Sequence, residues 1–167
     1  MYRKINDFEQ DWADESESTL KVLRALSDAS LEQRVGERGR TAGRLAWHIT
    51  GSLPEMAHTA GLKGIDSSAD EAPAPSAAAD IAAEYEKAAR SLGDAVRSQW
   101  CDEELGDEIP MYGQMWTKGK VLSVIIRHQT HHRGQLTVLM RQAGLAVPGC
   151  YGPAAEEWQA MGMPPME

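Results

Sequence analysis

Two histidines one helical turn apart are the clearest sign of chemistry in this sequence. His128 and His132 lie within residues 120–142, whose apolar period is that of a single helix. At about 100° per residue, the pair lines up with Val121 and Leu139, in the middle of the stripe predicted to face the core. A buried neutral imidazole has a donor and an acceptor that both need partners. A metal ion shared by residues i and i+4 would satisfy both rings.

The spacing alone leaves two interpretations open, a metal-binding pair or two core imidazoles hydrogen-bonded to neighbouring polar groups. Two ligands do not make a tight site, because zinc-like ions take three or four, so a third must come from elsewhere in the chain. His131 lies about 80° from the centre of the stripe, and we expect it to point toward another helix or a subunit surface. The sequence has no HExxH, CxxC, Gly-rich phosphate loop or GxSxG motif.

Several polar residues near the pair are candidates for supporting roles. Gln129 and Gln135 are close enough in sequence to hydrogen-bond the ligands. Arg133 could hold an anionic substrate or pair with an acidic side chain on a neighbouring helix, and the sequence leaves both open. Tyr151 and Cys150 lie in a tail that could fold back over the end of the bundle. No base is assigned to Cys150, so we interpret it as a small buried or idle thiol.

Four amphipathic segments must position these residues. The predicted helices cover residues 7–28, 41–60, 77–100 and 118–143, followed by a tail over residues 145–167. Helical periods without credible strands predict a single all-α four-helix-bundle domain over residues 1–167.

Local signals predict where these helices begin and end. Asp7, Thr41 and Thr117 are the expected N-caps, and Gly61 is expected to end the second helix. Pro54 predicts a kink or an early end in that helix.

The connecting segments differ in composition. Residues 64–76 are rich in Asp, Ser, Ala and Pro and are predicted to link the second and third helices across the end of the bundle. Residues 101–116 are acidic and then interrupted by Gly and Pro, which predicts a solvated loop with at most a short extended piece and no sheet. We do not expect the carboxylates of this loop to be metal ligands.

Two further histidines and two tryptophans have no clear role on spacing alone. His48 lies on the shoulder of the apolar stripe of its helix, which slightly favours a partly exposed surface histidine. His58, near the helix end, is explained by the helix dipole and solvent. Trp47 and Trp116 could equally wall a pocket or pack in a core or a dimer face.

Composition excludes several classes of protein. The chain has 167 residues, of which 25% are charged and 42% hydrophobic, and a formal charge of −8. These values are typical of one globular domain, and the negative charge argues against a nucleic-acid partner. The sequence lacks a bilayer-length apolar stretch, a signal-peptide core and enough cysteines for a disulfide framework. We therefore expect a soluble cytoplasmic protein without a membrane partner.

Two stretches resemble the DinB-like (YfiT-like) family of metal-binding four-helix bundles, which is distinct from the DNA polymerase of the same name. They are residues 40–49, RTAGRLAWHI, and residues 128–136, HQTHHRGQL, the latter continuing through Arg141, Gly144, Val147-Pro148 and Tyr151-Gly152-Pro153. The resemblance implies a divalent-metal site formed by His48, His128 and His132, which reverses the surface interpretation of His48. It also implies a long crossover between the second and third helices, and a homodimer.

Three imidazoles leave open positions on a divalent ion for water or a substrate. Several ions suit imidazole, and we expect zinc or nickel. The ion could lower the pKa of a bound water for hydrolysis, or activate a low-molecular-weight thiol. The resemblance to thiol S-transferases in the wider family favours the second use and a small-molecule substrate. A metal-dependent hydrolase and a non-catalytic metal-binding stress-response module are the alternatives, and no catalytic residue is assigned.

Overall fold

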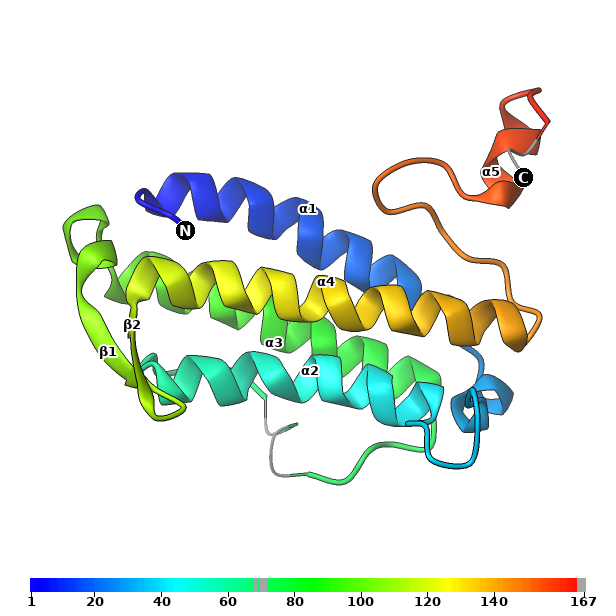
Figure 1. The fold of residues 1–167 in the computed structure, drawn as a ribbon, viewed down its shortest axis with the longest axis horizontal. Helices are drawn as coiled ribbons and strands as arrows, with labels where there is room; N and C mark the ends of the chain where they lie inside the picture. The colour runs from blue at the N-terminus through cyan, green and yellow to red at the C-terminus, as the bar shows by residue number, and fades with distance from the viewer. Residues whose placement is uncertain (68, 70–71, 165–167) are drawn as a thin grey trace.

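Four long helices form the body of the protein, confirming the predicted all-α class (Figure 1). The structure is a computed structural model that describes residues 1–67, 69 and 72–164. The helices are α1 (Ile5–Arg24), α2 (Ala42–Thr59), α3 (Ala78–Gln99) and α4 (Lys118–Gln142). Helices α1 and α2 each pack against both α3 and α4. Among the described residues, no helix is both long and apolar enough to cross a membrane.

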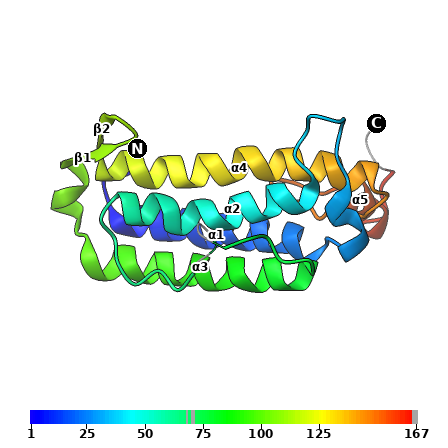
Figure 2. The ribbon, with the colours of Figure 1, turned by 90° about the horizontal axis from the view of Figure 1, so that it is seen from below.

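The segment between α2 and α3 runs back along the bundle. It leaves the end of α2 near the β strands and reaches the opposite end before α3 begins (Figures 1 and 2). Helices α2 and α3 therefore run in the same direction, whereas α1 and α4 run in the opposite one. The expected crossover is present, but it spans the length of the bundle rather than one end.

The bounds of α2, α3 and α4 lie within one residue of the prediction. Thr41 and Thr117 are the N-caps, and their hydroxyls accept hydrogen bonds from the amides of Arg44 and Lys120. Gly61 has a φ of +85° directly after α2, as expected for a glycine that ends a helix. Pro54 does not end α2, which continues to Thr59.

Helix α1 begins earlier than predicted. Its N-cap is Lys4, which provides no side-chain cap, so the prediction of Asp7 was wrong. The amide of Ile5 instead donates to Oδ1 of Asp102 at 2.7 Å, so an acceptor from a distant segment replaces a local cap. The helix ends at Arg24, before the predicted end, and a 3₁₀ helix follows over Asp28–Glu32.

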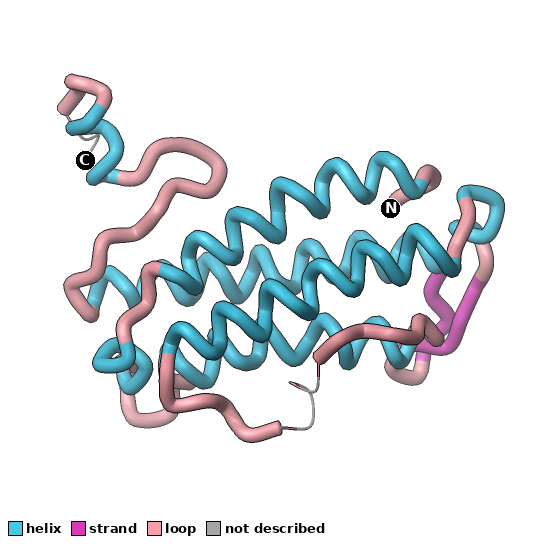
Figure 3. Tube along the Cα trace, turned by 180° about the vertical axis from the view of Figure 1, so that it is seen from behind, coloured by secondary structure: helices cyan, strands magenta, loops and turns pink. Residues whose placement is uncertain are grey.

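Residues predicted as a loop contain a β-hairpin. Strand β1 (Glu108–Met111) pairs antiparallel with β2 (Gln114–Thr117), at one end of the bundle (Figure 3). Tyr112 and Gly113 form the turn, with φ values of +51° and +77°. Two-residue hairpin turns require positive φ values, which asparagine adopts far more readily than tyrosine. The prediction that this segment contains no sheet was therefore wrong.

The apolar residues Val121 and Leu139 of the predicted stripe of α4 are buried, but the centre of the buried face lies to one side of that stripe. This centre carries the buried side chains of Leu122, Ile125, Gln129, Arg133 and Leu136. The exposed fractions of Gln129 and Arg133 are 0% and 2%, whereas His128 and His132 are only partly buried. The predicted centre was wrong because counting apolar residues treats buried glutamine and arginine as surface residues. The histidine pair thus lies on the shoulder of the core, toward α2.

Candidate metal centre

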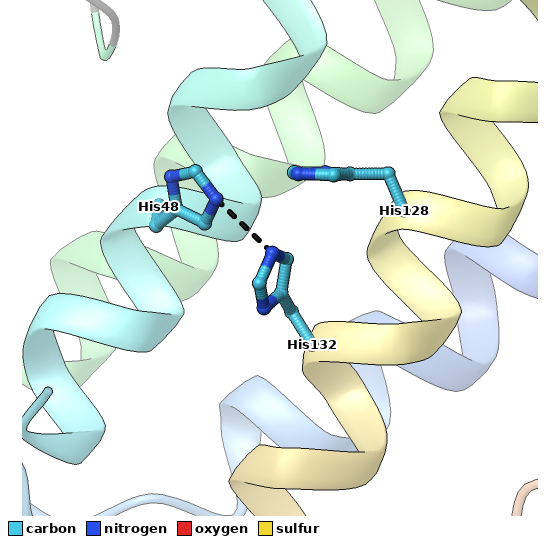
Figure 4. A group of neighbouring side chains, drawn as sticks. All are labelled: His48, His128 and His132. Atoms are coloured by element: carbon cyan, nitrogen blue, oxygen red, sulfur yellow. Dashed lines mark hydrogen bonds between the residues drawn. The ribbon is translucent and has the colours of Figure 1, made fainter. Parts of the chain in front are cut away.

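Three imidazole rings converge between α2 and α4 (Figure 4). Helix α2 supplies His48, and α4 supplies His128 and His132. The Nε2 atoms of His48 and His132 lie 3.2 Å apart. One nitrogen from each of the three rings lies within 4.8 Å of the others. The packing of α2 on α4 therefore brings together two histidines one turn apart and a third from a distant segment.

These distances fit a metal ion. Two imidazole nitrogens bound to one tetrahedral zinc ion, at roughly 2.0–2.1 Å each, lie about 3.3 Å apart. The separation of 3.2 Å between His48 and His132 is close to this value. The Nδ1 atom of His128 is buried and has no hydrogen-bond partner. A cluster of uncharged nitrogen donors that includes an unsatisfied buried atom is chemically suited to a divalent cation.

The rings are held in their neutral form. Burial lowers the pKa of His48 to about 4, and the positive charge of Arg40 and the neighbouring histidines add to the effect. Burial likewise lowers the pKa of His128 to about 4 and also lowers that of His132. Only neutral imidazole binds a metal ion, so the site needs no proton release from these rings near neutral pH.

Gln135 orients the ring of His132. Its carbonyl oxygen lies 2.8 Å from Nδ1 of His132, and its amide nitrogen lies 3.1 Å from Nε2 of His131. Because an amide oxygen only accepts, Nδ1 of His132 must donate. The lone pair of His132 is then on Nε2, the atom that faces His48. His131 itself is exposed and is not part of the cluster.

The sequence of the whole chain matches a known family model. The model described as the DinB family matches residues 1–166. The chain belongs to the DinB family. It is 40% identical over 163 residues to the protein YrdA of Bacillus subtilis (strain 168), covering 98% of this chain and 97% of YrdA.

Solved structures of DinB-like proteins have the same fold. The crystal structure of one from Bacillus cereus ATCC 10987 aligns with a TM-score of 0.86 at 42% identity, covering 90% of this chain and all of that one. A second, YjoA from Bacillus subtilis, aligns with a TM-score of 0.68 at 20% identity, covering 86% of this chain and 96% of YjoA. The second similarity supports the fold alone.

Beside the histidines of this DinB-family chain lies a cleft of about 530 Å³. His48 and His128 line it, as do Trp47 and Trp116, so both tryptophans contribute to a pocket wall. The indole of Trp47 donates to the carbonyl oxygen of Ala72 at 2.9 Å, which ties α2 to the crossover segment. The imidazole cluster therefore borders a space of the size that small-molecule ligands occupy.

Arg133 is directed away from the cluster, into the core. Its guanidinium forms a salt bridge of 2.8 Å with Glu15 of α1 and donates to Thr19 at 3.0 Å. It also donates to the hydroxyl of Tyr151 at 2.9 Å and lies over that ring. Of the two roles left open by the sequence, the structure places Arg133 with an acidic partner on a neighbouring helix. Tyr151 holds the tail against this pair and does not line the cleft.

Two further candidates also lie outside the cluster. The carbonyl oxygen of Gln129 accepts from Tyr85 at 2.7 Å in the core, while its amide nitrogen is buried without a partner. Cys150 is partly buried, and burial raises the pKa of its thiol, which disfavours a nucleophilic thiolate.

Sequence reasoning missed the acidic partner in the core and the polar end of the cleft. Glu15 interrupts the apolar stripe of the first helix, and that interruption was the available signal. Glu55 and Tyr112 line the cleft, and their side chains form a hydrogen bond of 2.6 Å. They lie 57 residues apart in the sequence, and no local motif indicates that they meet.

Proposed function

We propose that this DinB-family protein is a metal-dependent enzyme that transfers a low-molecular-weight thiol to a small electrophile. His48, His128 and His132 would hold the ion, with zinc or nickel as the expected metals. The observation that supports this most is a cluster of three neutral nitrogen donors, two of which, from His48 and His128, lie at the wall of an open cleft. In the described part of the chain, no fourth His, Cys, Asp or Glu joins the cluster. A site with three protein ligands leaves a position for a substrate.

Different residues of the chain would bind the metal ion, orient its ligands and contact the substrate. A bound divalent ion supplies Lewis acidity, which lowers the pKa of a thiol that contacts it. Gln135 holds His132 with its Nε2 lone pair toward the cluster, so the site is preorganised. Trp47 and Trp116 give the cleft apolar walls, against which the body of a substrate can pack away from water.

Metal analysis of untagged protein tests the site. We expect about one zinc ion per chain in the wild type and at least tenfold weaker binding in His48→Ala, His128→Ala and His132→Ala. His58→Ala is the matched control, because His58 is an exposed histidine of α2 outside the cluster, and it should keep its metal. Full metal retention in all three ligand variants would overturn the proposed site.

Activity is then measured on the zinc-loaded protein with a small thiol and a chromogenic aryl halide. We expect transfer by the wild type and by His58→Ala, and its loss in His128→Ala. Ester hydrolysis without thiol transfer would favour the hydrolase. If the absorption spectrum of the cobalt-substituted protein does not change on adding thiol or anion, the ion has no exchangeable position and the protein is a binding module.

The homodimer and the cytoplasmic location stay predictions. Sedimentation of the purified protein tests the first, and fractionation of cells tests the second.

A further inference from the structure

The cleft beside the histidine cluster has opposite charges at its two ends. Arg44, His48 and Glu55 lie on one side of α2, and all three line the cleft. A helix rises about 1.5 Å per residue, so Arg44 lies about 6 Å before His48 along the axis and Glu55 about 10 Å after it. The side chains between them are small, since Gly51 and Ser52 occupy the intervening turns and leave room for a ligand.

Neither charge is neutralised within the described structure. Salt bridges join many charged side chains of the described residues, but none of these pairs includes Arg44 or Glu55. Glu55 is partly buried, and its carboxylate accepts a hydrogen bond from Tyr112 at 2.6 Å. Tyr112 is itself fixed in the hairpin turn, so the carboxylate has a defined orientation. A partly buried carboxylate without a cation favours a ligand that brings one.

The other end of the cleft is positive. Arg44 is exposed in the first turn of α2, and Arg40 lies just before that helix. Arg44 lines the cleft and precedes His48 by one turn of α2, so its charge lies beside the cluster. An anionic group bound here would lie within reach of a guanidinium, whose planar donors match a carboxylate.

We propose that the cleft binds a zwitterionic thiol of about the length of a tripeptide. Its carboxylate pairs with Arg44, its sulfur lies at the three histidines, and its ammonium group pairs with Glu55. An extended tripeptide spans about 10 Å, and the two side chains can bridge the rest of the roughly 16 Å between their helix positions. The volume of about 530 Å³ is sufficient for such a molecule. This inference rests on the proposed function, because it names the thiol that the same site would take.

Calorimetric titration of zinc-loaded protein with glycylcysteinylglycine tests the two contacts. Each charge can be removed from the probe, by N-acetylation or by C-terminal amidation. We expect Glu55→Gln to weaken binding of the free peptide about tenfold and to leave the acetylated peptide unchanged. Arg44→Gln should weaken the free peptide similarly and leave the amidated peptide unchanged. Circular dichroism of both variants confirms that they are folded.

Matched controls are available in the exposed loop before α2. Glu37→Gln and Arg38→Gln each remove a charge of the same sign outside the cleft, and they should leave the affinity for each peptide unchanged. If Glu55→Gln weakens binding of the free and acetylated peptides equally, or weakens neither, then Glu55 does not contact the ammonium group and the inference is overturned. If Arg44→Gln weakens binding of the free and amidated peptides equally, or weakens neither, then Arg44 does not contact the carboxylate.

Zinc content and the serine analogue separate this inference from the proposed function. A protein that holds no zinc overturns the proposed function alone. Binding of glycylserylglycine needs the two charges but no thiol, so its response to Glu55→Gln and Arg44→Gln then decides the charge contacts. If zinc and glycylcysteinylglycine bind but every charge variant behaves as wild type, only the further inference fails.

Discussion

Gln135 accepts a hydrogen bond from Nδ1 of His132, with the amide oxygen 2.8 Å from the ring nitrogen. This contact fixes which nitrogen of the ring keeps its lone pair. Gln135, one helical turn after His132, therefore sets the orientation and the tautomer of this candidate ligand without being a ligand itself.

Loss of this contact should weaken metal binding without removing a ligand. We expect Gln135→Ala to lower zinc affinity about tenfold, because the ring of His132 would then be free to rotate and to change tautomer. Gln142→Ala, an exposed glutamine on the same helix, is the control and should bind zinc as the wild type does. Competition with a chromogenic chelator measures both. Equal affinities in the two variants would mean that Gln135 has no orienting role.

The metal-free protein should become less stable as the pH falls from about 6.5 to about 4. Burial lowers the folded-state pKa of both His48 and His128 to about 4, from an ordinary value of 6.5. In this window the unfolded chain binds more protons than the folded chain, so stability decreases as the pH decreases.

Urea denaturation at a series of pH values measures this dependence. Other groups also titrate in this range, so the comparison is with His128→Gln, which should show a smaller decrease than the wild type. An equal decrease in both proteins would show that His128 is not responsible.

Two glycines of α4 should respond in opposite ways to alanine. A Cβ atom at Gly119 would lie 2.1 Å from the carbonyl oxygen of Tyr2, so Gly119→Ala should lower the free energy of unfolding by about 1–3 kcal/mol. A Cβ atom at Gly134 would meet nothing within 4 Å, so Gly134→Ala should raise it by about 0.5–1 kcal/mol. Thermal or urea unfolding of the two variants gives the comparison. A Gly119→Ala variant as stable as the wild type would contradict the close approach of Tyr2 to α4, and a destabilised Gly134→Ala variant would contradict the open space at Gly134.

Arg133 should matter to folding rather than to substrate binding. Arg133→Met leaves Glu15 as a nearly buried carboxylate without its cation, and we expect a loss of about 3–5 kcal/mol in unfolding free energy. The double variant Arg133→Met/Glu15→Leu removes the stranded charge and should recover much of that loss. If the double variant is no more stable than the single one, the pairing does not account for the effect. A selective loss of affinity for anionic ligands, with stability intact, would restore the substrate role.

The helices could be predicted because their signals are local. Apolar periods and the caps at Thr41 and Thr117 lie within each segment, and the structure confirms them. The start of α1 could not be predicted from local signals, because it depends on Asp102, 97 residues away. The hairpin was missed because tyrosine is an unusual residue for a turn with positive φ. The spacing of His48 does not indicate that it faces two histidines of another helix, so the cluster could be predicted only from the family resemblance. The charge of Glu55 does not indicate that it faces Tyr112, so the cleft could be found only in the structure.

The cluster and the cleft are built from different kinds of structure. The three histidines lie on helices whose positions are fixed by the core, whereas the hairpin and the crossover segment contribute much of the cleft wall beyond α2 and α4. Sequence changes in the hairpin or the crossover can therefore alter what the cleft accepts while leaving the donor atoms in place. This separation makes the scaffold suited to diversification and to engineering. Tyr112 lines the cleft, so exchanging its turn for that of a relative tests whether the hairpin sets the preference for one ligand over another.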